Sequence, residues 1–323
     1  METPIQSLTS SFQLLIMRIA IIDMGTNTFH LLVAEIENQD FRILLQERIP
    51  VKIGVGGINQ GIIIPAAIDR AIEALKKFKK DLDELAVVKI FAFGTSALRN
   101  AKNGIEVVSK LKENTGIETK IISGDEEATY IYAGVNLALN LEKEKSLIMD
   151  IGGGSVEFII GNGEEIFWKQ SFEIGAQRLL ELFQTHDPIL ANEIDELNHY
   201  FEKKLVPLFD AIQKHQPKVM AGSSGTFDTL SDIYCIQSSI ALKGSPETPL
   251  AFESFENIYK ELISKNRQER MQIPGMIELR VDMIVVASCL IKFILVKYRF
   301  EKIRVSSYSL KEGVMASLIE QNH

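Results

Sequence analysis

The stretch that decides the fold runs Leu147-Ile148-Met149-Asp150-Ile151-Gly152-Gly153-Gly154-Ser155-Val156-Glu157. An apolar run ends at a carboxylate, three glycines and a serine follow, and a second apolar run begins. This pattern predicts two strands joined by a tight turn in which no side chain shields the backbone N–H groups. Such N–H groups beside a hydroxyl form a concavity suited to phosphate oxygens, and the flanking carboxylates suit a divalent cation bound with the phosphate. A glycine-rich hairpin with two surface acids is the alternative.

The same pattern occurs a second time near the N-terminus. Residues 21–33 align without a gap on residues 148–160, and Asp23 stands in the place of Asp150. The acid, the first glycine, the hydroxyl residue and both apolar flanks are in register. The copies lie too far apart for a solenoid, whose repeats are about 20–50 residues long. They predict two similar domains whose turns face each other across a cleft, so that one phosphate site is made from both.

The bulk composition agrees with a two-domain globular protein. The chain has 323 residues, of which 46% are hydrophobic and 24% charged. A net charge of −8 argues against a nucleic-acid or anionic-membrane partner, because such proteins usually carry a basic face. Cys235 and Cys289 match no metal-ligand or disulfide pattern, so we expect reduced core cysteines and a cytoplasmic location. Charges interrupt the apolar segment 279–300, which indicates a buried helix.

Polar residues follow two expected strands of the first half, at the edge of an open α/β sheet where ligands collect. After the strand 87–93 come Ser96 and Arg99, and we expect both to contact phosphate, Arg99 through bidentate hydrogen bonds. A solvated arginine at a helix start is the alternative. After the strand 119–122 comes Glu127, which could orient or deprotonate a water molecule. Acids in a first helical turn are also favoured by the helix dipole alone, which is the alternative here.

A third glycine-and-hydroxyl turn is expected in the second half of the chain. It follows the strand 217–221 and precedes a helix expected from Phe227, and it comprises Gly222, Ser223, Ser224, Gly225 and Thr226. Glycine and hydroxyl residues at a helix N-terminus form an anion-binding turn. The spacing of dinucleotide-binding and P-loop motifs is absent from the chain.

The remaining pattern predicts alternating strands and helices. Strands are expected at 41–53 and 302–306 and from Ser146, Val156 and Glu165, and helices are expected at 66–85, 176–183, 192–215, 252–266, 279–298 and 309–320. The five histidines are scattered and build no metal motif. Met17 could be the native start, which would make residues 1–17 an N-terminal extension.

These blocks together resemble the exopolyphosphatase/guanosine-pentaphosphate phosphatase (Ppx/GppA) family, within the actin–hexokinase–Hsp70 superfold. The matching blocks occur in the family's order, and they are residues 23–28, 95–103, 122–128, 150–157, 222–226 and 307–313. The resemblance implies two ribonuclease-H-like domains with an interdomain cleft. We expect domain I at 18–140 plus 308–323 and domain II at 141–307, with the last helix returning to the first domain.

The resemblance also implies roles for individual residues. Glu127 corresponds to the catalytic base, and Asp150 and Glu157 would act with it by holding the metal or positioning the attacking water. The implied metal is Mg²⁺ or Mn²⁺, held by Asp150, Glu157 and Asp23. Phosphate would be bound by Arg99 and Ser96 and by the three turns, whose residues are Gly25, Thr26, Asn27, Thr28, Gly152, Gly153, Gly154, Ser155, Gly222, Ser223, Ser224, Gly225 and Thr226.

The resemblance implies hydrolysis of a terminal phosphoanhydride of polyphosphate or guanosine pentaphosphate. A possible homodimer is the default assembly. Two alternatives are an actin-like ATP-dependent switch and a non-catalytic sensor of polyphosphate or an alarmone. Thr26, Thr28 and Val156 depart from the usual family residues, which are serine, serine and threonine. Longer relatives carry an additional C-terminal helical region, so we expect a shorter polyphosphate channel here.

Overall fold

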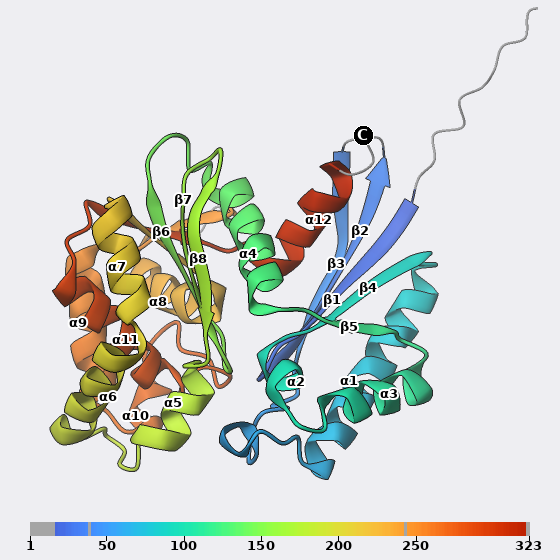
Figure 1. Cartoon of the computed structure of the whole chain (residues 1–323), viewed down its shortest axis with the longest axis horizontal. Helices are drawn as coiled ribbons and strands as arrows, with labels where there is room; N and C mark the ends of the chain where they lie inside the picture. The colour runs from blue at the N-terminus through green and yellow to red at the C-terminus, as the bar shows by residue number, and fades with distance from the viewer. Residues whose placement is uncertain (1–16, 38–39, 242–243, 321–323) are drawn as a thin grey trace, which may run out of the picture.

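The computed structural model describes residues 17–37, 40–241 and 244–320 as two sheets with helices packed on them (Figure 1). The first sheet has the strand order β3-β2-β1-β4-β5. Its strands are β1 (Met17–Met24), β2 (Thr28–Glu37), β3 (Asp40–Pro50), β4 (Lys89–Gly94) and β5 (Thr119–Ile121). Its helices are α1 (Pro65–Glu84), α2 (Ser96–Asn100), α3 (Gly104–Thr115) and α4 (Gly124–Leu139), with a 3₁₀ turn η1 at Ile58–Gln60.

The second sheet has the strand order β10-β11-β9-β6-β7-β8. Its strands are β6 (Ser146–Ile151), β7 (Val156–Gly161), β8 (Ile166–Phe172), β9 (Val219–Ser223), β10 (Glu247–Pro249) and β11 (Lys302–Ser306). The helices of this half are α5 (Ala176–Phe183), α6 (Ala191–Lys204), α7 (Val206–His215), α8 (Ser224–Gln237), α9 (Phe252–Ser264), α10 (Arg267–Arg270) and α11 (Ile284–Lys297), followed by α12 (Leu310–Glu320).

The two sheets repeat one topology. In each, the first two strands are antiparallel neighbours, and the first strand is also parallel to a later one, β4 in the first sheet and β9 in the second. β5 and β11 then extend the parallel part of their sheets. The two-domain α/β fold predicted from the repeated Asp–Gly turn is therefore the observed one.

Successive side chains of β1 and of β6 pack into different hydrophobic cores, one on each face of the sheet. In β1, Ala20, Ile22 and Met24 pack against α1 and α3, whereas Ile19 and Ile21 pack toward α4 and α12. In β6, the apolar side chains alternate in the same way, and Ile148 joins the layer that contains α4 and α12. Successive side chains of a strand point to opposite faces, so both strands are buried on both sides. The layer of α4 and α12 thus lies between the sheets, as Figure 1 also shows.

Two glycines bring α4 and α12 into close contact. A Cβ atom on Gly313 of α12 would overlap the carbonyl oxygen of Tyr130 in α4, and one on Gly134 of α4 would overlap the carbonyl of Ser309. The absence of side chains lets the two helix backbones touch at this crossing. The last helix is therefore held on α4 and also contacts β1.

Some predicted boundaries were wrong. The helix expected at 192–215 is broken at Leu205, because Pro207 has no N–H and its ring clashes with the preceding turn of a continuous helix. The helix expected at 279–298 begins only at Ile284, and α8 begins at Ser224 rather than at Phe227. The third strand ends at Pro50 rather than at residue 53.

Other expectations concern the ends of the chain and the cysteines. Of the proposed extension, residues 1–17, residues 1–16 lie outside the described residues, and Met17 is instead the first residue of β1. Cys235 and Cys289 are free and buried, as predicted. Within the described ranges no helix has the length and apolarity needed to cross a membrane.

The helix crossing gives a stability prediction. Replacing Gly313 with alanine should lower the free energy of unfolding by about 1–3 kcal/mol, because the added Cβ forces α12 away from α4. The gain in intrinsic helix propensity, about 1 kcal/mol, opposes this loss only in part. Urea unfolding followed by circular dichroism measures the change. Leu137→Ala, at an exposed position of α4, is the control and should change little. An alanine variant as stable as the parent would contradict the close contact.

Candidate active site

The two copies of the Asp–Gly turn have the same construction. In the first, the Gly25 N–H donates to the carbonyl of Thr28 at 3.1 Å, and in the second the Gly152 N–H donates to the carbonyl of Ser155 at 3.0 Å. In the strand register, Asp23 is opposite His30, and Asp150 is opposite Glu157. His30 therefore occupies in the first turn the place of Glu157 in the second.

The two turns touch each other across the domains. A Cβ atom on Gly153 would lie 2.5 Å from the Asn27 side-chain nitrogen, and one on Gly154 would overlap the hydroxyl oxygen of Thr26. Gly175, at the start of α5, leaves as little room against the backbone of Gly153. Any side chain at these positions would push the turns apart, so the glycines are required by the close approach of the domains.

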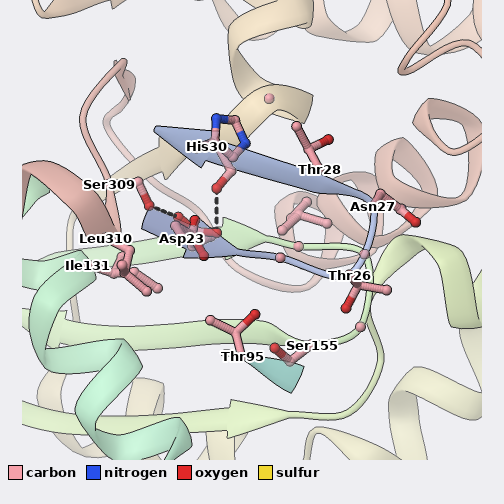
Figure 2. Close-up of a pocket in the computed structure, with 18 of the residues that line it drawn as sticks. Asp23, Thr26, Asn27, Thr28, His30, Thr95, Ile131, Ser155, Ser309 and Leu310 are labelled. Carbon is pink, nitrogen blue, oxygen red and sulfur yellow. Dashed lines mark hydrogen bonds between the residues drawn. The ribbon is translucent and has the colours of Figure 1, made fainter. Parts of the chain in front are cut away.

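Beside the turns lies a cavity of about 130 Å³ with walls from both halves of the chain. Figure 2 shows Thr26, Thr95 and Ser155 on one side of it and Asp23, His30 and Ser309 on another. Most of the residues predicted from the sequence line this cavity, and they are Asp23, Gly25, Thr26, Asn27, Thr28, Ser96, Glu127, Asp150, Gly152, Gly153, Gly154, Ser155, Glu157, Ser224 and Gly225. The predicted residues outside the lining are Arg99, Gly222, Ser223 and Thr226.

Asp150 is held by three serine hydroxyls, two of them from adjacent residues and the third from the segment before α12. Its Oδ2 atom accepts from Ser223 at 2.6 Å and from Ser309 at 2.6 Å, and its Oδ1 atom accepts from Ser224 at 2.5 Å. Ser224 has a φ of 70°, which is uncommon for a residue with a side chain and occurs where the surrounding structure enforces it. Hydrogen bonds to both oxygens fix the carboxylate at the cavity wall.

Glu126 and Glu127 take different roles at the start of α4. Glu126 completes a capping box with Ser123 and pairs with Lys120, so it is the acid that stabilises the helix end. Glu127 is buried, lines the cavity and accepts a hydrogen bond from Arg99 Nη1 at 2.7 Å. Burial raises the pKa of Glu127 to about 7 against the opposing effect of Arg99. Its carboxyl group therefore exchanges a proton near neutral pH, as a general base requires.

Two further acids line the cavity, and they are the buried Glu157 and the partly buried Asp23. Burial raises the pKa of Asp23 to about 7, and Lys311 opposes that rise. The Oδ1 atom of Asp23 has no hydrogen-bond partner in the described structure. Burial and the nearby Glu127 raise the pKa of Glu157 well above its usual value, although Glu157 accepts a hydrogen bond from Ser171 at 2.6 Å. Several acids thus lie close together, and the negative charge of each disfavours ionisation of the others.

Sequence reasoning missed three cationic side chains that line the cavity. They are Arg48 of β3, Arg280 before α11 and Lys311 of α12. Arg280 lies directly over Gly225, where a Cβ atom would overlap its guanidinium, and its Nε atom has no partner within the described residues. Arg280 could have been found as a charge inside an apolar segment, and Lys311 lies within the block 307–313. The other lining residues that were not predicted are His30, Thr95, Ile131, Ile151, Asp228, Ser307, Ser309 and Leu310.

The fold and the cavity define a class of protein: a two-domain α/β protein of the actin-like type, with a cleft suited to phosphate groups. The chain belongs to the Ppx/GppA phosphatase family, whose model matches residues 32–322. An exopolyphosphatase from Cytophaga hutchinsonii is 47% identical, with a TM-score of 0.90 over 94% of this chain and 98% of its own. The Ppx/GppA family member of Aquifex aeolicus is 26% identical, with a TM-score of 0.78 over 96% of this chain and 100% of its own.

Asp228 gives a pH prediction. Burial raises the pKa of Asp228 to about 7, and Arg280 and Lys311 oppose this rise. Between pH 3.8 and about pH 7 the folded protein therefore keeps a proton on Asp228 that the unfolded chain has lost. The stability contributed by Asp228 is present below its ordinary pKa of 3.8 and is lost as pH rises to about 7. Asp228→Asn should therefore make the loss of stability between pH 5 and pH 7 less steep, by up to about 1.4 kcal/mol per pH unit. Urea unfolding at several pH values in a metal chelator measures this slope. Equal slopes for variant and parent would contradict it.

Proposed function

We propose that this protein hydrolyses the terminal phosphoanhydride bond of inorganic polyphosphate and releases orthophosphate. The observation that carries the proposal is the buried Glu127 carboxylate on the wall of a cavity shared by two glycine-and-hydroxyl turns. Backbone N–H groups of the turns would hold phosphate oxygens, and Glu127 would take a proton from the attacking water. The family match and the Cytophaga hutchinsonii exopolyphosphatase support this reaction class.

Because the cavity contains several acids, an anionic substrate needs positive charge nearby in order to bind. Arg48, Arg280 and Lys311, which also line the cavity, would supply part of it. These cations would bind the transferred phosphoryl group and stabilise the charge that develops on its oxygens. Glu127 would remain near the water, because Arg99 orients its carboxylate by a direct hydrogen bond.

A divalent cation, Mg²⁺ or Mn²⁺, fits part of the predicted ligand set. Mg²⁺ usually takes one or two carboxylates, with phosphate oxygens and waters as its other ligands. Asp23 offers a buried oxygen without a partner, and Asp150 and Glu157 lie on the same cavity. The described residues contain no ready-made cluster of three such acidic, histidine or cysteine ligands, so phosphate oxygens would complete the set. The bound cation would neutralise phosphate charge.

The size of the cavity favours the end of a polyphosphate chain over a whole nucleotide. At about 130 Å³ it is smaller than the roughly 300–1,000 Å³ of typical small-molecule sites. The terminal phosphate of guanosine pentaphosphate could enter it, but the nucleoside would lie outside. Hydrolysis of guanosine pentaphosphate is therefore the second candidate. An ATP-dependent switch and a non-catalytic sensor are the remaining alternatives.

A parallel substrate assay tests the proposed reaction. The full chain with Mg²⁺ is given polyphosphate, guanosine pentaphosphate or ATP, and released orthophosphate is measured. We expect rapid release from polyphosphate and slower release from guanosine pentaphosphate, because only the terminal phosphate fits the cavity. Release from ATP alone would instead identify a nucleotide switch, and binding without release would identify a sensor.

Replacing Glu127 with glutamine tests its role as the base. The amide keeps the size of the side chain but cannot accept the proton of water, so kcat should fall by about 10²–10⁴ with little change in substrate affinity. Steady-state kinetics on polyphosphate measures both quantities. Glu126→Gln is the matched control, because the neighbouring acid caps the helix and should leave kcat within a few-fold. Equal kcat values for Glu127→Gln and the parent would exclude Glu127 as the base.

A further inference from the structure

Glu173 makes an unusual set of contacts at the edge of the cavity. It lies between β8 and α5, outside the cavity lining. Its carboxylate accepts hydrogen bonds from the Ser96 hydroxyl at 2.6 Å, from Arg99 Nη2 at 3.2 Å and from Arg178 Nη2 at 3.3 Å. Ser96 and Arg99 belong to α2 of the first half, whereas Arg178 belongs to α5 of the second. One carboxylate therefore joins the two sides of the cleft.

Ser96, Arg99 and Arg178 form a cluster of donors around Glu173, and the two arginines do not depend on Glu173 for their position. Arg99 is also bound to the carbonyl of Ile122 and to Glu127. Arg178 donates to the carbonyls of Ile58 and Gly154, each at 2.8 Å. These bonds hold both guanidinium groups in place, so the cluster would persist if Glu173 turned away.

Glu173 is more exposed than the two arginines that bind it. Its side chain is 39% exposed, compared with 16% for Arg99 and 11% for Arg178. The carboxylate can thus turn into solvent, while the arginines stay largely buried. Two guanidinium groups and a hydroxyl suit a phosphate group, which accepts the same bidentate hydrogen bonds as a carboxylate.

The cluster adjoins the proposed catalytic cavity. Ser96 belongs both to the cluster and to the cavity lining, and Gly154, whose carbonyl Arg178 binds, also lines the cavity. An anion held by the cluster would therefore lie next to the phosphate held by the glycine turns. A chain of linked phosphates could occupy both places at once.

We propose that Glu173 is a gate that occupies a second phosphate subsite formed by Ser96, Arg99 and Arg178. A phosphate group of the substrate chain displaces the carboxylate and takes over its hydrogen bonds. Displacement also breaks the contacts of Glu173 with the first domain, and the bound phosphate then joins Ser96 and Arg99 to Arg178 in its place. The gate rests on the proposed function in that it assigns the subsite to a polyphosphate substrate.

Replacing Glu173 with glutamine tests the gate by equilibrium binding. The amide keeps the size of the side chain and an acceptor oxygen but removes the charge that competes with phosphate. Titration calorimetry of sodium phosphate into the full chain should show about three- to tenfold tighter binding by Glu173→Gln than by the parent. The KM for polyphosphate should fall with it, since the same charge opposes the substrate.

Glu181→Gln is the matched control. Glu181 of α5 accepts a hydrogen bond from Asn59 of the first domain at 3.2 Å, so its change removes the same charge and also weakens an interdomain contact. Phosphate affinity should stay at the parent value in this variant. Equal phosphate affinities in the two variants, or weaker phosphate binding by Glu173→Gln, would overturn the gate. Glu173 would then serve only as a contact between the domains.

The binding assay separates failure of the gate from failure of the proposed function. Tighter phosphate binding by Glu173→Gln supports the gate even if the parent releases no phosphate from polyphosphate. Phosphate release by the parent without a gain in affinity in the variant overturns the gate alone.

Discussion

The close contact between the two Asp–Gly turns is the constraint on which the rest of the structure depends. Gly153 and Gly154 leave no space for a side chain against Asn27 and Thr26. Their contact brings the ends of β1 and β6 together, and with them Asp23 and Asp150. A side chain at either glycine would separate the domains and enlarge the cavity. The small size of the cavity is thus a direct consequence of the glycine sequence.

That contact also brings acidic groups together, at a cost that nearby cations offset only in part. Bringing several carboxyl groups into one buried space is unfavourable, and this cost is visible in the raised pKa values of Asp23, Glu127 and Glu157. Arg99 offsets part of it on one side, and Lys311 offsets part on the other. A cleft with this balance suits ligands that bring cations with them or that bind to arginines, and the proposed polyphosphate substrate would do both.

The sequence predicted the fold because one local pattern occurred twice. The match of residues 21–33 to 148–160 identifies two equivalent strand pairs, which are β1–β2 and β6–β7 in the structure. The sequence could not place Arg48, Arg280 and Lys311 at the same cavity, since these come from three segments that only the tertiary fold brings together. Helix limits also depend on local backbone chemistry, as the break before Pro207 shows.

The structure distinguishes Glu126 from Glu127, whereas their positions in the sequence do not. Both acids follow the same strand and both lie in the first turn of α4, so the helix dipole accounts equally for either. In the structure Glu126 satisfies the cap, which leaves Glu127 free of that task. The helical rotation between adjacent residues then turns Glu127 into the cavity, where Arg99 and burial control its proton. The capping box therefore positions the proposed base, because it fixes where the helix begins.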